Sequence, residues 1–287
     1  MTRGMSFRGR ATRVVLIGAL SVWAIIAIGP IIWVYYSSFK TNAQIVSNIW
    51  ALPHPWVLGN WITVLTSAVN SVPFITNIMN TLIVGIPAVI VVILAGSLAG
   101  FALARFRFAG AQAFQLFLLL LLPVPQFAVM VPVWSYMHTL GLTNSRLGLF
   151  LVYAAFNLAL AITLMRGFFS NFPSDILEAA LLDGCTEWYA FWRIVVPLSV
   201  GPMVTVGILT FSSVWNEFLF AVSLIQDPSK MTVQPALAAL SAGATGQLTF
   251  GWAQQFSALA ITTIIPVILF LVFQNRIFRA VTLQVQN

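Results

Sequence analysis

Few side chains in this sequence could perform chemistry, and none of them stands in a familiar catalytic or metal-binding pattern. The two histidines, His54 and His138, lie far apart and outside any spacing used for metal ligands, so we interpret both as interfacial residues. Cys185, the single cysteine, excludes an internal disulfide and has no histidine near it, which favours packing over nucleophilic catalysis. Because no convergent set of nucleophile, base and ligand is present, we expect no catalytic residue, no metal and no cofactor in this chain.

A nucleotide-binding loop is also missing from the sequence. Such a loop reads G-x-x-x-x-G-K-[ST], with the lysine reaching the phosphates of the nucleotide. The only lysines are Lys40 and Lys230, and they follow Phe39 and Ser229 rather than glycine. If this chain takes part in an ATP-driven process, another chain must therefore bind the ATP.

The six acidic residues are distributed unevenly. Four of them, Asp175, Glu178, Asp183 and Glu187, fall between residues 167 and 202. Glu217 lies inside an apolar run, where a carboxylate costs roughly 2.5–3.5 kcal/mol on membrane-insertion scales. The polar segment and the lone intramembrane acid are therefore the first candidates for functional positions.

The amino-acid composition indicates the kind of fold that carries these groups. Of the 287 residues, 60% are hydrophobic and only 7% are charged, whereas soluble domains carry about a quarter charged residues. The net charge of +7 comes from arginines between apolar runs, so we interpret it as a topology signal and expect no nucleic-acid partner. We find no internal repeat or linker, and the sequence predicts one all-α polytopic membrane domain over residues 1–287.

Six segments are long and apolar enough to cross a membrane as helices. The third contains Pro123, Pro125 and Pro132, so we expect it to be kinked or broken. Arginines before the first segment resemble the start of a signal peptide, but its apolar stretch exceeds the 7–15 residues of a signal sequence, which favours a retained span. The predicted spans are 14–36, 78–104, 114–137, 147–165, 203–225 and 256–273.

The distribution of basic residues predicts the orientation of the spans. With the N-terminus inside, three basic residues, Lys40, Arg146 and Lys230, fall in outer segments. Ten arginines fall in inner segments, and this bias predicts that both ends lie in the cytoplasm. The inner arginines are Arg3, Arg8, Arg10, Arg13, Arg105, Arg107, Arg166, Arg193, Arg276 and Arg279.

The inner loop 167–202 reads as two short helices. Asp175, with Glu178 three residues later, has the spacing of a capping box, and Gly184 is typical of a helix end. A second helix is expected from about Thr186 to Pro197, with an apolar stripe at Trp188, Phe191, Trp192 and Val195. The pattern fits either a hairpin lying on lipid headgroups or a docking element, although acids facing an anionic leaflet argue mildly against the first.

A resemblance distinguishes between these two readings. Glu178-Ala179-Ala180, three residues, Gly184, nine residues, Ile194, two residues and Pro197 resemble the EAA motif of ABC-transporter permeases, with Val196 where leucine usually precedes the proline. In that family the loop seats in a cleft of the ATP-binding subunit. The resemblance thus implies ATPase-coupling roles for Asp175, Glu178, Ala179, Ala180, Asp183, Gly184, Ile194 and Pro197.

Three further stretches resemble carbohydrate-uptake permeases of the maltose-system type: residues 102–108, Leu52-Pro53-His54-Pro55, and Trp215-Asn216-Glu217-Phe218-Leu219. The tail after Arg279 departs from that group, since it lacks a glycine-rich, lysine-containing ending. The resemblance implies a type I ABC importer permease fold in the bacterial cytoplasmic (inner) membrane. It also implies a second permease subunit in a heterodimer, two ATP-binding subunits that hold ATP and magnesium, an extracytoplasmic solute-binding protein, and contact with membrane lipid.

Polar residues inside the spans allow two interpretations. Asn216 and Glu217, and more weakly Asn157, are candidates for the pore or the interface with a partner permease. Alternatively, Glu217 anchors its helix near the outer surface, and Asn157 serves helix packing. The second outer loop, 226–255, matches by position the loop that in the maltose-type system reaches the binding protein.

Together these features predict a permease subunit of an ATP-driven importer of a sugar or related polar solute, coupled to a separate ATPase through loop 167–202. The alternative is a secondary transporter driven by an ion gradient. It would need intramembrane acids or histidines, and Glu217 alone supports it weakly.

Overall fold

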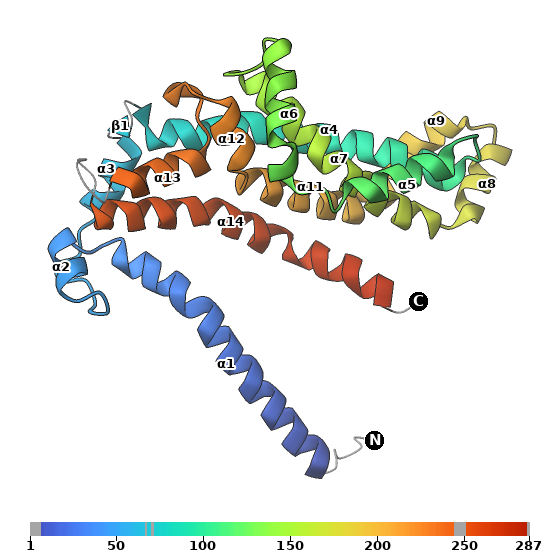
Figure 1. The fold of residues 1–287 in the computed structure, drawn as a ribbon. Helices are drawn as coiled ribbons and strands as arrows, with labels where there is room; N and C mark the ends of the chain where they lie inside the picture. Colours follow the sequence, from blue (N-terminus) through green and yellow to red (C-terminus); the bar gives the residue numbers. More distant parts are fainter. Residues whose placement is uncertain (1–6, 67, 70–71, 244–250, 286–287) are drawn as a thin grey trace. The chain divides into compact units, whose positions relative to one another are not determined.

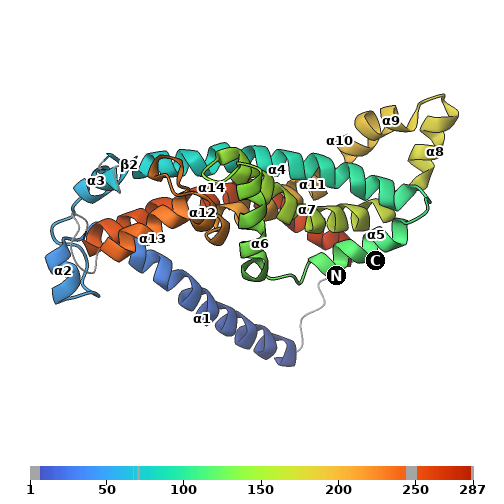
Figure 2. The same cartoon turned by 45° about the horizontal axis from the view of Figure 1, so that its top comes forward.

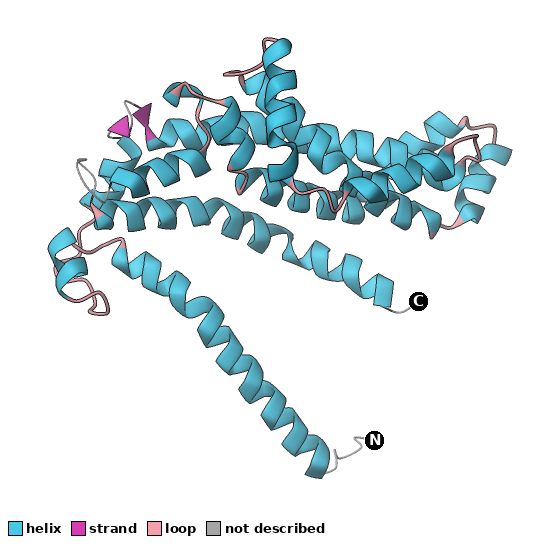
Figure 3. Ribbon diagram, in the orientation of Figure 1, coloured by secondary structure: helices cyan, strands magenta, loops and turns pink. Residues whose placement is uncertain are grey.

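The computed structural model describes residues 7–66, 68–69, 72–243 and 251–285, and side chains between residues 13 and 274 apart from short stretches. Arg3, the tip of the second outer loop at 244–250 and the last residues of the tail lie outside the described part. Figure 3 shows that the described chain is almost entirely helical. Its two short strands, β1 (Ala68–Val69) and β2 (Val72–Pro73), pair antiparallel with Val69 opposite Val72.

The helices follow one another along the chain with short connections (Figure 1). In order they are α1 (Phe7–Ser37), α2 (Asn42–Ser47), α3 (Gly59–Thr66), α4 (Phe74–Arg105), α5 (Ala111–Leu121), α6 (Gln126–Thr139), α7 (Arg146–Ser170), α8 (Ser174–Leu182), α9 (Glu187–Ala190), a π-helical turn η1 (Phe191–Val195), α10 (Val196–Leu198), α11 (Val200–Trp215), α12 (Leu219–Leu224), a 3₁₀ turn η2 (Pro228–Lys230), α13 (Val233–Gly243) and α14 (Trp252–Val285).

Two compact units can be distinguished. The first comprises Met1–Ser67 with Leu240–Ile261, and the second comprises Ala68–Ala239 with Thr262–Asn287. In the first unit, α2 begins with a capping box in which Thr41 and Gln44 bond reciprocally. Lys40 is fully buried beside it, with Nζ donating to the carbonyl of Ile49 at 2.6 Å, and this burial lowers the pKa of the Lys40 ammonium.

The second unit is built on the pairing of α4 with α7, which run side by side in Figure 2. Gly96 and Gly100 lie four residues apart on α4 and face α7 without a side chain between the two backbones. A Cβ atom at Gly96 would stand 2.9 Å from the Cβ of Ala161, and one at Gly100 would stand 2.8 Å from the backbone nitrogen of Arg166. This is the small-residue contact by which membrane helices approach closely.

Replacing Gly100 by leucine is expected to destabilise the second unit. The added side chain would have to displace the backbone of α7, and such overpacking costs about 1–3 kcal/mol. Thermal unfolding of the purified protein in detergent measures the loss. Gly18→Leu is the matched control, since a Cβ at Gly18 meets nothing within 4 Å. Equal stability of the two variants would contradict the close contact.

Four of the predicted spans correspond to helices that are long and apolar enough to cross a membrane. These helices are Val15–Ser37, Phe74–Arg105, Arg146–Ser170 and Trp252–Gln274, and they cover the first, second, fourth and sixth predicted spans within a few residues. Within the described residues, two bent pairs, α5 with α6 and Glu187–Leu198 with α11, bring the number to as many as six by length and composition.

The third predicted span is broken, as its prolines indicated. Helices α5 and α6 meet at 108°, and the break contains Pro123 and Pro125. Proline removes a backbone donor and clashes with the preceding turn, so the helix ends before it.

The prediction of one continuous helix over 203–225 was wrong. Helix α11 ends at Trp215 after 16 residues, which span about 24 Å, and α12 begins only at Leu219. Asn216 caps the first helix, and the carboxylate of Glu217 accepts from the first backbone N–H groups of the second. Hydropathy does not reveal this interruption because apolar residues lie on both sides of it.

Candidate functional site

The first helix of the inner loop, α8, starts differently from the prediction. Asp175 is not its N-cap: the helix begins at Ser174 after Pro173, and no side chain caps it. Pro173 is the N-cap, with a non-helical ψ of 117°, so the helix starts one residue before the proposed cap. Asp175 lies instead in the first turn, where a negative charge interacts favourably with the helix dipole.

The turn after α8 matches the prediction. Gly184 has φ of +86°, and its N–H donates to the carbonyl of Leu181 while the N–H of Cys185 donates to that of Ala180, both at 3.0 Å. These two bonds form a Schellman motif, which needs a left-handed residue. A Cβ at this position would meet nothing within 4 Å, so the backbone conformation rather than space favours glycine here.

The second helix of the loop begins where expected and ends slightly later. The Thr186 hydroxyl caps it by accepting from the N–H of Tyr189 at 3.2 Å. Its central part is the wide turn η1, and the helix runs past Pro197 to Leu198 before a bend of 75° into α11. In a regular α-helix the N–H of residue 197 would donate to the carbonyl of residue 193, but proline has no N–H. The wider π-helical turn therefore replaces a hydrogen bond that could not form here.

The structure divides the motif residues between two faces of this hairpin. Ala180 is buried, and Ile194 is half-buried, in a cluster with Met165 of α7 and Val206 of α11. The others are exposed: Asp175, Glu178, Ala179, Asp183, Gly184 and Pro197. One face thus fixes the hairpin to the helices, and the other presents three carboxylates and a small-residue surface.

Aromatic rings strengthen the attachment of the hairpin. Phe191 is 2% exposed, and its ring lies 5.0 Å from that of Phe101 on α4, which in turn lies 5.5 Å from Phe169 on α7. Such ring pairs contribute about 0.5–1.5 kcal/mol beyond their buried area. Figure 2 shows the hairpin extending beyond the ends of α4 and α7. The hairpin is thus attached to both of these helices.

The predicted aromatic stripe does not act as one surface. Phe191 and Val195 are buried against the helices, whereas Trp188 is 64% exposed and Trp192 is 36% exposed. The predicted helical spacing is present, but the stripe includes residues of the face packed against the helices (Phe191 and Val195) and residues of the exposed face (Trp188 and Trp192).

Glu217 is held by a cluster of short hydrogen bonds. Its carboxylate accepts from the Tyr153 hydroxyl at 2.8 Å and from the backbone N–H groups of Phe220 at 2.7 Å and Ala221 at 3.0 Å. The residue is 6% exposed. The carboxylate thus closes the start of α12 and ties it to α7.

Two other candidates lie close to this cluster in the chain. Asn216 is exposed, and its amide donates to the carbonyl of Ser212 at 2.8 Å. Asn157 is half-buried one turn after Tyr153 and donates to the Tyr153 carbonyl at 2.8 Å. Each amide is thus held by a bond to the carbonyl one turn earlier in its own helix.

The sequence did not predict a set of polar contacts between α4 and residues 229–233. Asn80 donates to the carbonyls of Ser229 and Met231 at 2.8 and 3.0 Å, and Thr81 accepts from the N–H of Val233 at 2.9 Å. These side chains, with Asn77, form a polar stripe at helical spacing that hydropathy averages away. They fix the first part of the second outer loop. In that part of the loop, hydrogen bonds from Ser229 lower the pKa of the half-buried Asp227, whose carboxylate also pairs with Lys230 at 3.6 Å.

No three histidine, cysteine or acidic side chains gather as a possible metal site within the described ranges. The site therefore consists of a rigid hairpin attached to a bundle of membrane helices, with a polar cluster deeper along the same helices.

Comparison with known proteins identifies the family. Residues 43–283 match the sequence model of the binding-protein-dependent transport system inner membrane component, and the chain belongs to this family. It is similar to the diacetylchitobiose uptake system permease protein NgcG of Streptomyces coelicolor, with 34% identity over 92% of this chain and 85% of that protein. It is also similar to the trehalose/maltose transport system permease protein MalG of Thermococcus litoralis, with 29% identity over 94% of this chain and 95% of that protein.

A solved structure agrees with this assignment. A bacterial ABC transporter involved in the import of the acidic polysaccharide alginate contains a chain that matches with a TM-score of 0.78 at 25% identity, over 96% of this chain and all of that one. The chain is thus a multi-pass inner-membrane permease subunit of an ABC importer. The family is a transport component rather than a catalytic one.

Proposed function

We propose that the chain couples ATP hydrolysis on separate subunits to solute movement, and that the α8–α9 hairpin is the coupling element. The observation that carries this proposal is the two-sided hairpin: one face is packed against α4, α7 and α11, and the other is free. Asp175, Glu178, Ala179, Asp183, Gly184 and Pro197 contact an ATP-binding subunit, while Ala180 and Ile194 hold the hairpin in place.

The proposed topology has six membrane crossings with both ends in the cytoplasm, in one transmembrane domain of residues 1–287. Four helices and the bent pair α5–α6, all of suitable length and apolarity, support five of these crossings. The sixth is α11, which bends by 75° from the second helix of the hairpin. The excess of arginine in the proposed inner segments supports the orientation, and it places the hairpin on the cytoplasmic side.

The partners follow from the family and from what the chain lacks. A second permease subunit completes the pathway as a heterodimer, two ATP-binding subunits hold ATP and magnesium, and an extracytoplasmic protein delivers the solute. This chain itself holds no cofactor. The absence of a phosphate-binding loop from its sequence supports a separate ATPase.

The proposed solute is a sugar or a related polar compound. Relatives named for diacetylchitobiose and for trehalose and maltose support this class. Asn216 and Asn157 contribute amide groups to the pathway or the partner interface, and Glu217 holds Asn216 in place through its own bonds to α12. Amides suit this task because they can donate to and accept from sugar hydroxyls.

Transport by reconstituted vesicles separates this function from an ion-driven secondary transporter. The complex is purified with its associated subunits and screened with mono- and oligosaccharides in the presence of its binding protein. We expect uptake to require ATP on the ATPase side and to persist when ion gradients are collapsed. Uptake that follows an ion gradient without ATP would refute the proposal.

A further inference from the structure

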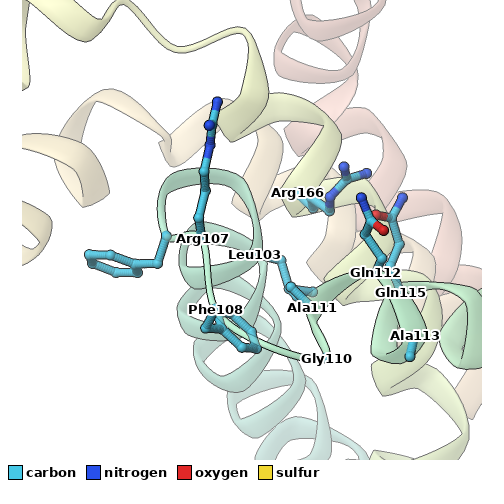
Figure 4. Close-up of a pocket in the computed structure, with 10 residues that line it drawn as sticks. Leu103, Arg107, Phe108, Gly110, Ala111, Gln112, Ala113, Gln115 and Arg166 are labelled. Atoms are coloured by element: carbon cyan, nitrogen blue, oxygen red, sulfur yellow. The ribbon is translucent and has the colours of Figure 1, made fainter.

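A cavity of about 700 Å³ lies at one end of the paired helices α4 and α7. Its walls come from Leu103 near the end of α4, the loop Phe106–Gly110, the first turn of α5 and Arg166 of α7. It is separate from the hairpin face and from the Glu217 cluster. Figure 4 shows the ends of Gln112 and Gln115 gathered near the end of Arg166, with Arg107 rising from the loop.

The polar groups of this cavity suit an anion. Two arginines, Arg107 and Arg166, are among its lining residues, and no acidic residue is. The Nε atom of Arg166 is buried and has no hydrogen-bond partner among the described residues. A guanidinium group is well matched to phosphate oxygens.

The first turn of α5 adds to this preference. The helix begins after Gly110 without any side-chain cap, and Gly110, Ala111, Gln112 and Ala113 all line the cavity. The first N–H groups of a helix have no intrahelical acceptor, and the helix dipole favours negative charge there. The close contact at Gly100 brings the backbone of Arg166 against α4, so the packing itself sets one wall of the cavity.

The surroundings distinguish a lipid from a soluble anion. Phe106 and Phe108 are exposed beside the arginines, and α5 continues with exposed Phe114, Leu116 and Phe117. A cationic recess bordered by apolar surface at the end of membrane helices matches a phospholipid, whose phosphate joins apolar chains. We propose that this cavity binds the phosphate headgroup of an anionic phospholipid, with Arg166 beside the phosphate, Arg107 adding positive charge from the loop, and the apolar rings on the adjoining glycerol and acyl chains.

This inference rests on the membrane location of the chain and not on the coupling role of the hairpin. The test uses the whole complex purified in mild detergent and native mass spectrometry with added phosphatidylglycerol or phosphatidylcholine. We expect the complex to retain phosphatidylglycerol in preference to phosphatidylcholine. Arg107→Gln and Arg166→Gln should each reduce this retention roughly fivefold, and the matched control Arg193→Gln, an exposed arginine outside the cavity, should not.

Three results would overturn the proposal. Unchanged retention in both cavity variants would show that the lipid binds elsewhere. Displacement of the lipid by inorganic phosphate alone would identify a soluble anion as the ligand. Loss of an ATP-binding subunit from the variants, with lipid retention intact, would identify a protein partner as the occupant. Arg107 is exposed, so Arg107→Gln keeps the test decisive even if Arg166→Gln fails to fold.

Discussion

Replacing Glu178 by arginine is expected to abolish solute-stimulated ATP hydrolysis by the assembled importer while leaving membrane insertion intact. Glu178 is exposed on the free face of α8, so its side chain contributes little to folding. A charge reversal at an interface leaves two like charges opposed and costs several kcal/mol, enough to prevent docking. ATPase activity of the purified complex, with and without solute and binding protein, measures the effect.

Glu187→Arg is the matched control for this prediction. It makes the same charge change on the same hairpin, in the first turn of α9 and outside the motif, and Glu187 is also exposed. We expect stimulated hydrolysis to continue in this variant. Equal loss in both variants would indicate a general charge effect rather than a contact made by α8.

Gly184→Asp tests the same contact from the turn. A residue with a Cβ costs about 1–2 kcal/mol in the left-handed conformation, but aspartate and asparagine tolerate it better than most. Gly184→Asn has nearly the same shape without the charge. We expect Gly184→Asp to lose coupling and Gly184→Asn to keep more of it. Unchanged coupling in both Glu178→Arg and Gly184→Asp would refute the docking role.

The second large effect is expected at Glu217. Glu217→Leu would leave the Tyr153 hydroxyl and the N–H groups of Phe220 and Ala221 without their acceptor. Each buried donor left without its acceptor costs about 1–3 kcal/mol, so we expect a markedly lower Tm and yield. Thermal unfolding in detergent measures the change.

Tyr153→Phe supplies the graded comparison. It removes one of the three bonds to the carboxylate and leaves the two backbone donors in place, so a loss of about 1–3 kcal/mol is expected. Thr163→Val is a matched control on the same helix, since Thr163 bonds only one turn back, to the Ala159 carbonyl. A Glu217→Leu protein as stable as the parent would contradict a supporting role for this carboxylate.

Much of this architecture could be predicted because it depends on local composition. Apolar length located α4 and α7 to within a few residues, and Pro123 and Pro125 located the break between α5 and α6. The glycine at 184 predicted a left-handed turn because few other residues adopt that conformation. These features depend on neighbours in sequence, which is why a single chain reveals them.

The remaining features depend on residues far apart in the chain. Tyr153 and Glu217 are 64 positions apart, so the residues next to Glu217 in sequence predict neither its partner nor the break before α12. The stripe from Trp188 to Val195 has helical spacing, but its division depends on Phe101 and Phe169 of other helices. The cap at Asp175 was wrong for a local reason, because Pro173 starts the helix earlier than the capping-box pattern requires.

Site-directed cross-linking tests the coupling account most directly. The single native cysteine allows a clean background of Cys185→Ser, into which Ala179→Cys is placed on the exposed face of α8. The control is Ile62→Cys, which is 64% exposed on α3 in a proposed outer segment. We expect a cross-linker to join position 179, and not position 62, to an ATP-binding subunit. Cross-links from position 179 only to lipid or to another permease, with none to an ATP-binding subunit, would contradict the account.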